Sequence, residues 1–366
     1  MNITTIKTKY TNAQLKLKRN VYNFIDPLTA PNPSIVYLIV NSRCNLYCKM
    51  CDVGQAEKES QFAQNMLSAE KDIDFDVYKK IIDDVAHFKP IIALTSTEPL
   101  LWKKIFDAVE YAKSKGCKVQ ITTNGILLPQ KIDTLVEKKL DVLWVSLDGI
   151  EAIHDDIRGI IGSYKKTTSG FALANNKIIE RGINHVVSNW NYDKIVEFAQ
   201  DIIKYHPTHV SFAHLNFITH EMSDIHNKTY LKTCMATPTC VSSIFPEDID
   251  YKFLFSQLKK AEEILSAEGI VISHSPKFKS EEDVRIFYNE PMKVVAKNKC
   301  TVPWDQAQFM ANGDMILMTR CFHLVMGNIS DNSFTELWNG KKMKNFRHEL
   351  HKVGMFPACT RCCGVL

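Results

Sequence analysis

Apolar and polar residues follow a repeating pattern along the first 220 residues of the chain. Short apolar runs such as Ile35–Val40 are typical of strands buried in a parallel sheet. Longer stretches with helical periodicity lie between them, as at Phe75–Phe88 and Trp102–Lys115. Further strands are predicted at Ile91–Leu94, Lys118–Thr122, Val142–Leu147 and His209–Phe212, a short apolar piece at His185–Val187, and further helices at Gln130–Lys139, Ser163–Arg181 and Asn191–Tyr205.

Strands that alternate with helices predict an α/β fold with a parallel sheet, in which chemistry lies at the carboxyl ends of the strands. Six strand–helix units are too few for a closed eight-fold barrel. We therefore expect a partial (β/α)6 barrel of TIM-like architecture. The stretch from Arg181 to Asn191 is short for a full fifth strand, and we assign no site residue to it.

The pattern changes after about His220. A long helix is predicted at Pro246–Glu268, and a later helix near Phe334–Leu350. Between them, Asn312-Gly313 is the strongest short signal for a tight β-hairpin. We expect four segments: an N-terminal extension at 1–33, the barrel at 34–225, a helical connector at 226–295 and a small hairpin-and-helix domain at 296–366.

Composition places the chain among ordinary globular proteins. Of its 366 residues, 45% are hydrophobic and 23% are charged, and the net charge is only +4. The Lys and Arg residues are scattered, so we expect no nucleic-acid partner. No uncharged apolar run approaches the roughly 18 residues of a membrane span, and the polar start lacks the apolar core of a signal peptide. We expect a cytoplasmic protein that does not bind a membrane.

Eleven cysteines are the unusual feature of the composition. Cys44, Cys48 and Cys51 follow the first predicted strand with the spacing CxxxCxxC. Thiolates are soft ligands that suit iron–sulfur clusters or zinc. Three of them can hold three corners of a cubane and leave the fourth iron open to a substrate or cofactor. The alternative is a structural zinc site completed by a distant His or Cys.

CxxxCxxC after the first strand of an α/β repeat resembles the signature of the radical S-adenosylmethionine (SAM) superfamily. Four later motifs, in the expected order, are similar to those of this family. They are Thr97-Glu98-Pro99-Leu100 for GGEP, Thr122-Thr123-Asn124-Gly125 for TTNG, Ser146-Leu147-Asp148-Gly149 for S-Φ-D-G, and His154-Asp155 through Arg158-Gly159 with Gly162-Ser163-Tyr164 for HDxxRG…GS(Y/F). One departure is that both glycines of GGEP are replaced, by Ser96 and Thr97.

The resemblance implies that Cys44, Cys48 and Cys51 hold a [4Fe–4S] cluster that binds SAM. Reductive cleavage of SAM then gives a 5′-deoxyadenosyl radical, which abstracts hydrogen from a substrate carbon. It also implies the cofactor contacts of the matching motif positions, with Met50 near the adenine, Arg158 at the SAM carboxylate, and Thr97, Glu98, Asn124 and Ser146 around the rest of the cofactor. For Asp148, a turn before Gly149 and a contact to the cofactor remain equal alternatives.

Cys300, Cys321, Cys359 and Cys362 make up a second group of cysteines at the chain's end. Their arrangement around a hairpin resembles the twitch domain, the short form of the SPASM domain, which implies one auxiliary [4Fe–4S] cluster. Cys363 is an alternative to Cys362, and a zinc ribbon is the alternative to the cluster. Cys234 and Cys240 have three possible roles, as buried structural thiols, as a hydrogen-atom donor or as extra ligands.

The auxiliary cluster suits net oxidation, substrate binding or electron relay. About 33 residues before the first strand are too few for a leader-peptide recognition domain, so we favour oxidation of a small or carbohydrate-like substrate. A peptide-modifying maturase and an epimerase are alternatives, and a non-catalytic iron–sulfur or zinc protein is another. The expected partners are the small-molecule or peptide substrate and an external electron donor of flavodoxin or ferredoxin type.

Overall fold

A computed structural model describes residues 26–67, 72–95, 97–241, 249–295 and 299–362 of the chain. Its central feature is one ten-stranded sheet in the order β10-β9-β8-β1-β2-β3-β4-β5-β6-β7. Strands β1 to β7 are parallel to their neighbours, and β8 is parallel to β1. The β8–β9 and β9–β10 pairs are antiparallel. The bounds are β1 Ile35–Leu38, β2 Ile91–Leu94, β3 Lys118–Thr123, β4 Val142–Ser146, β5 Glu180–Val187, β6 His209–His214, β7 Val271–Ser275, β8 Gln306–Phe309, β9 Asp314–Ile316 and β10 Val325–Asn328.

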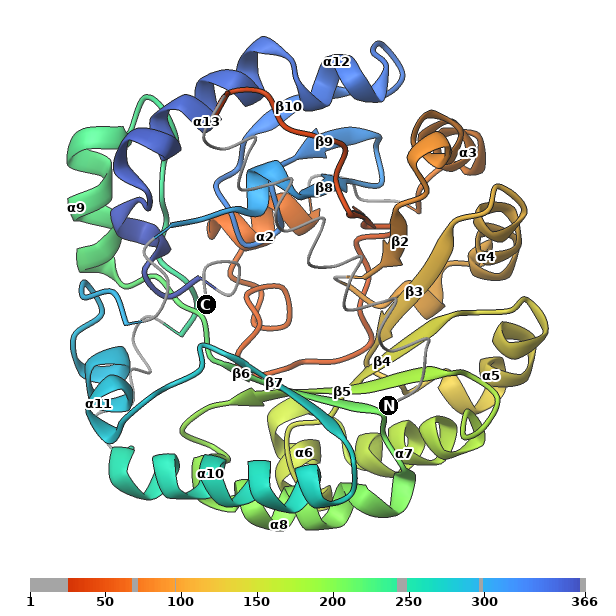
Figure 1. The fold of residues 1–366 in the computed structure, drawn as a ribbon, viewed down its shortest axis with the longest axis vertical. Helices are drawn as coiled ribbons and strands as arrows, with labels where there is room; N and C mark the ends of the chain where they lie inside the picture. Colours follow the sequence, from red (N-terminus) through yellow and green to blue (C-terminus); the bar gives the residue numbers. More distant parts are fainter. Residues whose placement is uncertain (1–25, 68–71, 96, 242–248, 296–298, 363–366) are drawn as a thin grey trace.

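Helices line the outside of this curved sheet, and the strands surround the interior (Figure 1). Each α/β crossover returns the chain to the same edge of the parallel strands, as the sequence pattern predicts. The α-helices are α2 Gln61–Leu67, α3 Phe75–Val85, α4 Ile105–Ser114, α5 Leu128–Glu137, α6 Glu151–Arg158, α7 Ser163–Leu173, α8 Ile195–Ile202, α9 His220–Tyr230, α10 Tyr251–Ala267, α11 Glu281–Asn289, α12 Phe334–Trp338 and α13 Lys341–Val353. Short 3₁₀ helices include η5 Val302–Trp304 and η6 Pro357–Cys359.

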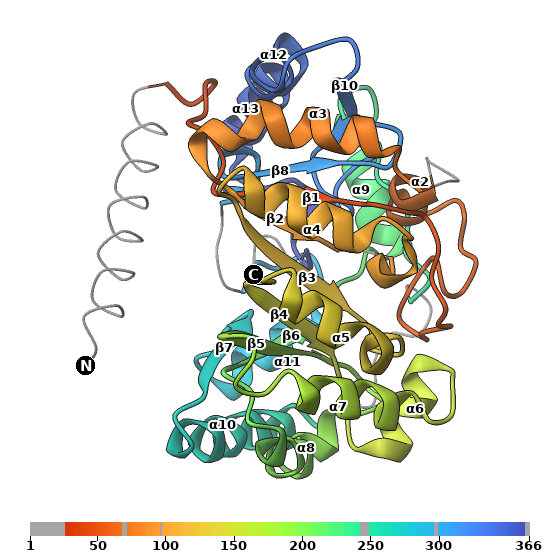
Figure 2. The same ribbon diagram turned by 90° about the vertical axis from the view of Figure 1, so that its right-hand side faces the viewer.

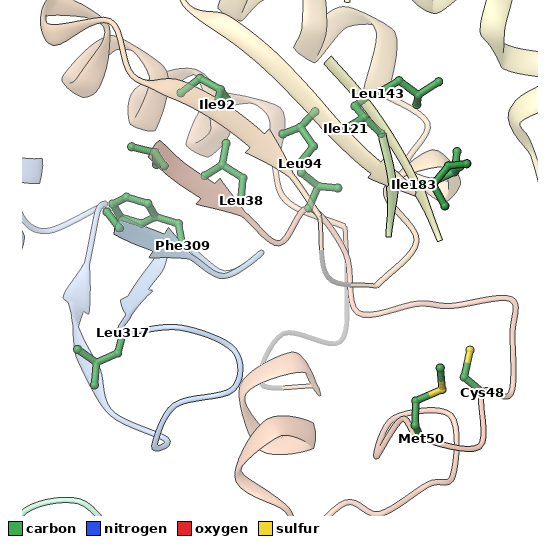
Figure 3. Packing of buried hydrophobic residues seen from close by; sticks show 14 of the residues in the cluster. Leu38, Cys48, Met50, Ile92, Leu94, Ile121, Leu143, Ile183, Phe309 and Leu317 are labelled. Carbon is green, nitrogen blue, oxygen red and sulfur yellow. The ribbon is translucent and has the colours of Figure 1, made fainter. Parts of the chain in front are cut away.

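The core lies between the strands and the helices that cover them. Leu38, Ile92, Ile121 and Leu143 come from four successive strands and are fully buried. Figure 3 shows these side chains on neighbouring strands, with Cys48 and Met50 on the loop beyond the strand ends. Burial of the apolar runs therefore fixes where the polar strand ends lie.

The partial-barrel prediction is confirmed, and the C-terminal hairpin extends its sheet. β8 pairs in parallel with β1, with Leu38 opposite Phe309. In Figure 2, α12 and α13 lie at the opposite end of the molecule from α8 and α10. The C-terminal cysteine region is therefore fastened directly to the strand that precedes the first cysteine motif.

Three local predictions differ from the structure. The fifth strand is complete, since β5 pairs with β4 and β6 over Glu180–Val187. The segment 226–295 is not only helical, because β7 adds a parallel strand beside β6. The helix predicted near Phe334–Leu350 is two helices, α12 and α13, separated at Asn339-Gly340.

Some sequence predictions fall outside the described residues. These are the structure of most of the N-terminal extension (residues 1–25), the position of Ser96, the start of the helix predicted from Pro246, and the position of Cys363. Among the residues that are described, no helix is both long and apolar enough to span a membrane.

Candidate active site

The first cysteine motif forms a loop at the carboxyl end of β1 that is held by helix α6. The backbone N–H of Tyr47 donates to the Arg158 carbonyl at 3.2 Å, and that of Lys49 donates to the Ile157 carbonyl at 2.9 Å. Gly159 has a φ of +75°, and a Cβ there would lie 2.8 Å from the Tyr47 oxygen. The turn after α6 therefore requires glycine, because the cysteine loop passes against it.

The three thiols of this loop lie near one another and near two nitrogen donors. Burial raises the pKa of Cys44 to about 12, and the charges of Cys48 and Cys51 contribute to this rise. An Arg158 Nη1 lies 3.7 Å from the Cys48 sulfur, and the Asn124 side-chain nitrogen lies 3.9 Å from the Cys44 sulfur. N–H groups directed at thiolate sulfur stabilise the negative charge of a cluster and tune its potential. This donor set fits an iron–sulfur cluster.

Arg158 and Asp148 form a buried ion pair beside Cys48. Their side chains are 2.6 Å apart and are 11% and 0% exposed. The other Asp148 oxygen accepts a hydrogen bond from the Val186 N–H at 2.8 Å. Burial raises the pKa of the Cys48 thiol, and the nearby guanidinium lowers it. In this structure the guanidinium thus contacts a carboxylate and a cysteine; its contact with the SAM carboxylate stays a prediction.

Glu98 is fully buried, and its carboxylate binds the end of β3 and the start of the loop that follows this strand. Its carboxylate accepts hydrogen bonds from the Asn124 N–H at 2.8 Å and the Thr123 hydroxyl at 2.7 Å. Thr97 donates its hydroxyl proton to the Asn41 carbonyl at 2.6 Å, and the Asn41 amide donates to the Glu98 carbonyl at 2.9 Å. The threonine that replaces a glycine of the GGEP motif is therefore hydrogen-bonded to the chain just before the cysteine loop.

Burial raises the pKa of Glu98 to about 7, although three hydrogen bonds to the carboxylate oppose this shift. A folded-state pKa above the unfolded value means that the folded protein binds the extra proton between about pH 4.5 and 7. Stability from this group is therefore lost as the pH rises through that window. We expect the Tm gap between wild type and the less stable Glu98→Gln variant to narrow from pH 5 to pH 7.5. A gap that stays constant in differential scanning calorimetry would contradict the assignment.

Met50 and Ser146 lie at the positions that the sequence motifs predict. Met50 is buried with the core around the cysteine loop, and Figure 3 shows it next to Cys48. Ser146 ends β4, half-buried, in register with Asn184 of β5. Their contact with SAM stays a prediction, as do those of Thr97, Glu98, Asn124 and Asp148.

Sequence reasoning missed the residues that hold the Asp148 turn. Asn191 donates its side-chain amide to the carbonyls of Asp148 and Val186, both at 2.8 Å. His154 accepts the Asp148 N–H at 3.1 Å on Nδ1, and burial lowers its pKa to about 4, so it stays neutral. His154 was visible within the HDxxRG motif, but nothing in the sequence alone connected Asn191 to Asp148.

Asp155 of the same motif explains why the downstream Gly-Ser-Tyr motif accompanies it. Its carboxylate accepts hydrogen bonds from the backbone of Gly162 and Tyr164 and from the Ser163 hydroxyl, at 2.6, 2.8 and 2.8 Å. These are the first residues of α7, so Asp155 caps that helix and joins it to α6. The pair of motifs is a structural unit that fixes the position of Arg158.

The second group of predicted ligands lines one apolar cavity of about 70 Å³. Cys300 precedes η5, Cys321 follows β9, and Cys359 and Cys362 lie at η6. Burial raises the pKa of Cys359, and the charge of Cys300 raises it further. No three described His, Cys, Asp or Glu side chains converge on a single metal ion. The ligands of a cubane do not need to do so, because each thiolate binds a different iron.

Asn65 joins the two cysteine regions. It lies on α2, shortly after the first cysteine loop, and is fully buried. Its side-chain amide donates to the carbonyls of Thr319 at 3.1 Å and Cys321 at 2.7 Å, and its oxygen contacts His323 Nδ1 at 2.9 Å. Partners more than 250 residues apart in sequence gave no signal that could have revealed this contact.

Cys234 and Cys240 differ in their surroundings. Cys234 is buried, burial raises its pKa to about 12, and its sulfur lies 3.8 Å from His226 Nε2. These features match the structural reading. Asp52, the residue directly after Cys51, is buried, and its carboxylate accepts a hydrogen bond from the Cys240 N–H at 2.9 Å. Cys240 thus lies beside the first cysteine loop, and its role stays open.

The sequence models of two known families match separate parts of the chain. The radical SAM superfamily matches residues 38–202, and the SPASM iron–sulfur cluster-binding domain matches residues 300–363. The chain therefore contains a radical SAM domain followed by a SPASM domain. The matched radical SAM region contains the first cysteine loop, Glu98, the Asp148–Arg158 pair and the carboxyl ends of β1 to β5. This confirms the resemblance and its cofactors: a [4Fe–4S] cluster with SAM in the first domain, and auxiliary iron–sulfur in the second.

Several radical SAM relatives are similar over about half of the chain. Pre-heme d1 synthase of Dinoroseobacter shibae is 26% identical over 50% of this chain and 45% of its own length. Fe-coproporphyrin III synthase of Methanosarcina barkeri is 33% identical over 43% of this chain and 38% of its own. The chain therefore spans half or less of the length of these relatives. A tungsten-containing aldehyde ferredoxin oxidoreductase cofactor-modifying protein of Pyrococcus furiosus is 24% identical over 89% of this chain and 86% of its own length.

Solved radical SAM structures share the fold. Streptococcus suis SuiB bound to its precursor peptide SuiA has a TM-score of 0.61 at 14% identity and covers 92% of this chain and 71% of that one. The anSMEcpe structure with bound AdoMet has a TM-score of 0.61 at 18% identity and covers 88% of this chain and 84% of that one. At these identities the likeness concerns the arrangement of the barrel and C-terminal domain only.

Proposed function

We propose that this radical SAM enzyme oxidises a small-molecule substrate by two electrons, with hydrogen abstraction at the first cluster site and electron acceptance at the auxiliary one. The observation that carries the proposal is the rigid link between the two cysteine regions. Asn65 binds the backbone of Cys321, and β8 pairs with β1 in one sheet. A substrate bound between two regions held in fixed register can give up hydrogen on one side and an electron on the other.

The residues of this chain divide the work as follows. Cys44, Cys48 and Cys51 would hold the SAM-binding cluster, and Cys300, Cys321, Cys359 and Cys362 the auxiliary one. When bound, the first cluster and SAM supply the radical that abstracts hydrogen. Arg158 and Asn124 direct N–H groups at the cysteine sulfurs, while Asp148 orients Arg158. The buried loop around Glu98 excludes water from the strand ends.

The names of the relatives support a small substrate over a peptide. Two relatives that match about half of the chain are named for haem-type compounds, and one that matches 89% of it is named as a cofactor-modifying protein. A peptide substrate is the second candidate, because the fold neighbour SuiB is described with a bound precursor peptide.

The test separates the two cluster sites. Anaerobically reconstituted protein with SAM and dithionite should release 5′-deoxyadenosine, and the Cys359→Ala/Cys362→Ala variant should retain this release. The small-molecule fraction of a host extract should stimulate release in both proteins, but net oxidation of the substrate should fail in the variant. No 5′-deoxyadenosine from wild type, or stoichiometric zinc, would overturn the enzyme assignment. Stimulation that protease treatment of the extract abolishes would favour the peptide candidate.

A further inference from the structure

The outer surface of the C-terminal domain contains a hollow of about 490 Å³. Three segments form it: the end of α9, the start of β10 and one face of α13. In Figure 1, α9 and α13 lie side by side at the edge of the molecule, and α9 contacts η6. The lining residues include Lys232, Val325, Met326, Lys342, Phe346 and His348.

The hollow and the cysteine cavity share a lining residue. Phe346 on α13 lines both the hollow and the cavity of Cys300, Cys321, Cys359 and Cys362. It is buried and lies on the boundary of both. A molecule bound in the hollow would therefore contact a residue that also lines the auxiliary site.

The lining of the hollow is basic at its edge and apolar at its floor. Lys232 and Lys342 are exposed, and Lys342 Nζ donates to the Val325 carbonyl at 3.1 Å, which holds the ammonium at the edge. Among the described residues that line the hollow, Glu349 carries the carboxylate, and it forms an ion pair with Lys352 at 3.0 Å. Met326 and Phe346 are buried below. An apolar centre with a charged rim is the usual anatomy of a protein interface.

We propose that this hollow is the docking surface for an acidic one-electron carrier protein of flavodoxin or ferredoxin type. The inference rests on the proposed function, because it requires a cluster behind Phe346. One electron passes from the reduced auxiliary cluster to the oxidised carrier, so the cluster is oxidised as the carrier is reduced and no bond forms or breaks. Redox encounters use small interfaces, and opposite charges steer them. A small interface fits the volume of the hollow, and an acidic partner fits its positively charged edge.

The test measures binding rather than turnover. A purified oxidised flavodoxin and a purified [2Fe–2S] ferredoxin serve as probes, and biolayer interferometry reports their Kd for the reconstituted holoenzyme. We expect at least one probe to bind wild type, with affinity that falls as salt rises. The Lys232→Glu/Lys342→Glu variant should bind about tenfold or more weakly. Lys252→Glu/Lys260→Glu, on α10 at the opposite end of the molecule (Figure 2), is the charge-matched control and should bind as wild type does.

Cross-linking locates the contact independently. A carbodiimide should join Lys232 or Lys342 to a carrier carboxylate in preference to Lys260. Binding of neither probe to wild type, or equal binding by all variants, overturns the proposal. So does binding of inorganic phosphate alone that is lost in the double variant, which would identify a small-anion pocket. Dithionite-driven SAM cleavage and iron content should be unchanged in every variant, so failure here is distinguishable from failure of the proposed function.

Discussion

Replacement of Cys44, Cys48 and Cys51 together by alanine should remove about half of the bound iron and all of the SAM cleavage. If each cysteine region holds one cubane, reconstituted wild type contains about eight irons and the variant about four. The reason is geometric: the three thiols lie on one loop, and nitrogen donors of Arg158 and Asn124 approach the sulfurs of Cys48 and Cys44. Iron and sulfide analysis measures the first effect, and chromatography of 5′-deoxyadenosine the second.

Cys117→Ala is the control for this triple replacement. Cys117 is buried immediately before β3, away from both cysteine regions in the sequence, and its loss should leave iron content and SAM cleavage unchanged. The assignment of the first site fails if the triple variant keeps about eight irons or still cleaves SAM. It also fails if the remaining iron disappears together with the first half, because the two sites have separate ligands.

The part of the fold that the sequence predicts best is the part with simple burial. The first four strands are short apolar runs, and each was placed within a residue or two of its observed end. Because parallel strands point their carboxyl ends to one side, motif residues at those ends had to meet. Glu98 and Asn124 do meet, through a hydrogen bond of 2.8 Å across neighbouring strand ends.

The missed strands have physical reasons. β5 contains Arg181, which is buried with its guanidinium over the Phe171 ring, and Gly182, where a Cβ would lie 2.3 Å from the Trp144 ring. Neither residue type signals a buried strand. β7 lies at the edge of the sheet and none of its residues is fully buried, so it lacks an apolar run. Pattern reasoning depends on apolar runs buried on both faces; β7 lacks that burial, and β5 is buried but interrupted by a charged residue and a glycine.

The single long helix predicted near the end of the chain fails for a different reason. Asn339 ends α12 and Gly340 precedes α13, where a Cβ would lie 2.2 Å from the Glu336 oxygen. The Asn339 side chain accepts hydrogen bonds from the Ala30 N–H at 2.9 Å and from Arg347 at 2.8 Å. Partners on a distant segment determine this break, and helical periodicity alone does not contain that information.

Loss of the charge on Asp148 should cause the largest change in stability. The Asp148→Asn side chain keeps the oxygen that accepts the Val186 N–H, but it leaves the Arg158 guanidinium buried without its partner. Breaking a buried pair from one side costs about 3–5 kcal/mol of unfolding free energy. We expect a loss of this size in urea denaturation. Glu151→Gln, which breaks an exposed pair with Lys165 on the neighbouring helices, is the control and should change little.

The two single variants at this pair should affect Cys48 in opposite directions. The Arg158 charge lowers the pKa of the Cys48 thiol and the Asp148 charge raises it, so Arg158→Met should raise that pKa and Asp148→Asn should lower it. Yet both should reduce stability, and the double variant should be less damaged than the sum of the two. The pH profile of Cys48 alkylation in the apoprotein, followed by mass spectrometry, measures the pKa. Parallel shifts would mean that the pair acts on Cys48 only through the fold.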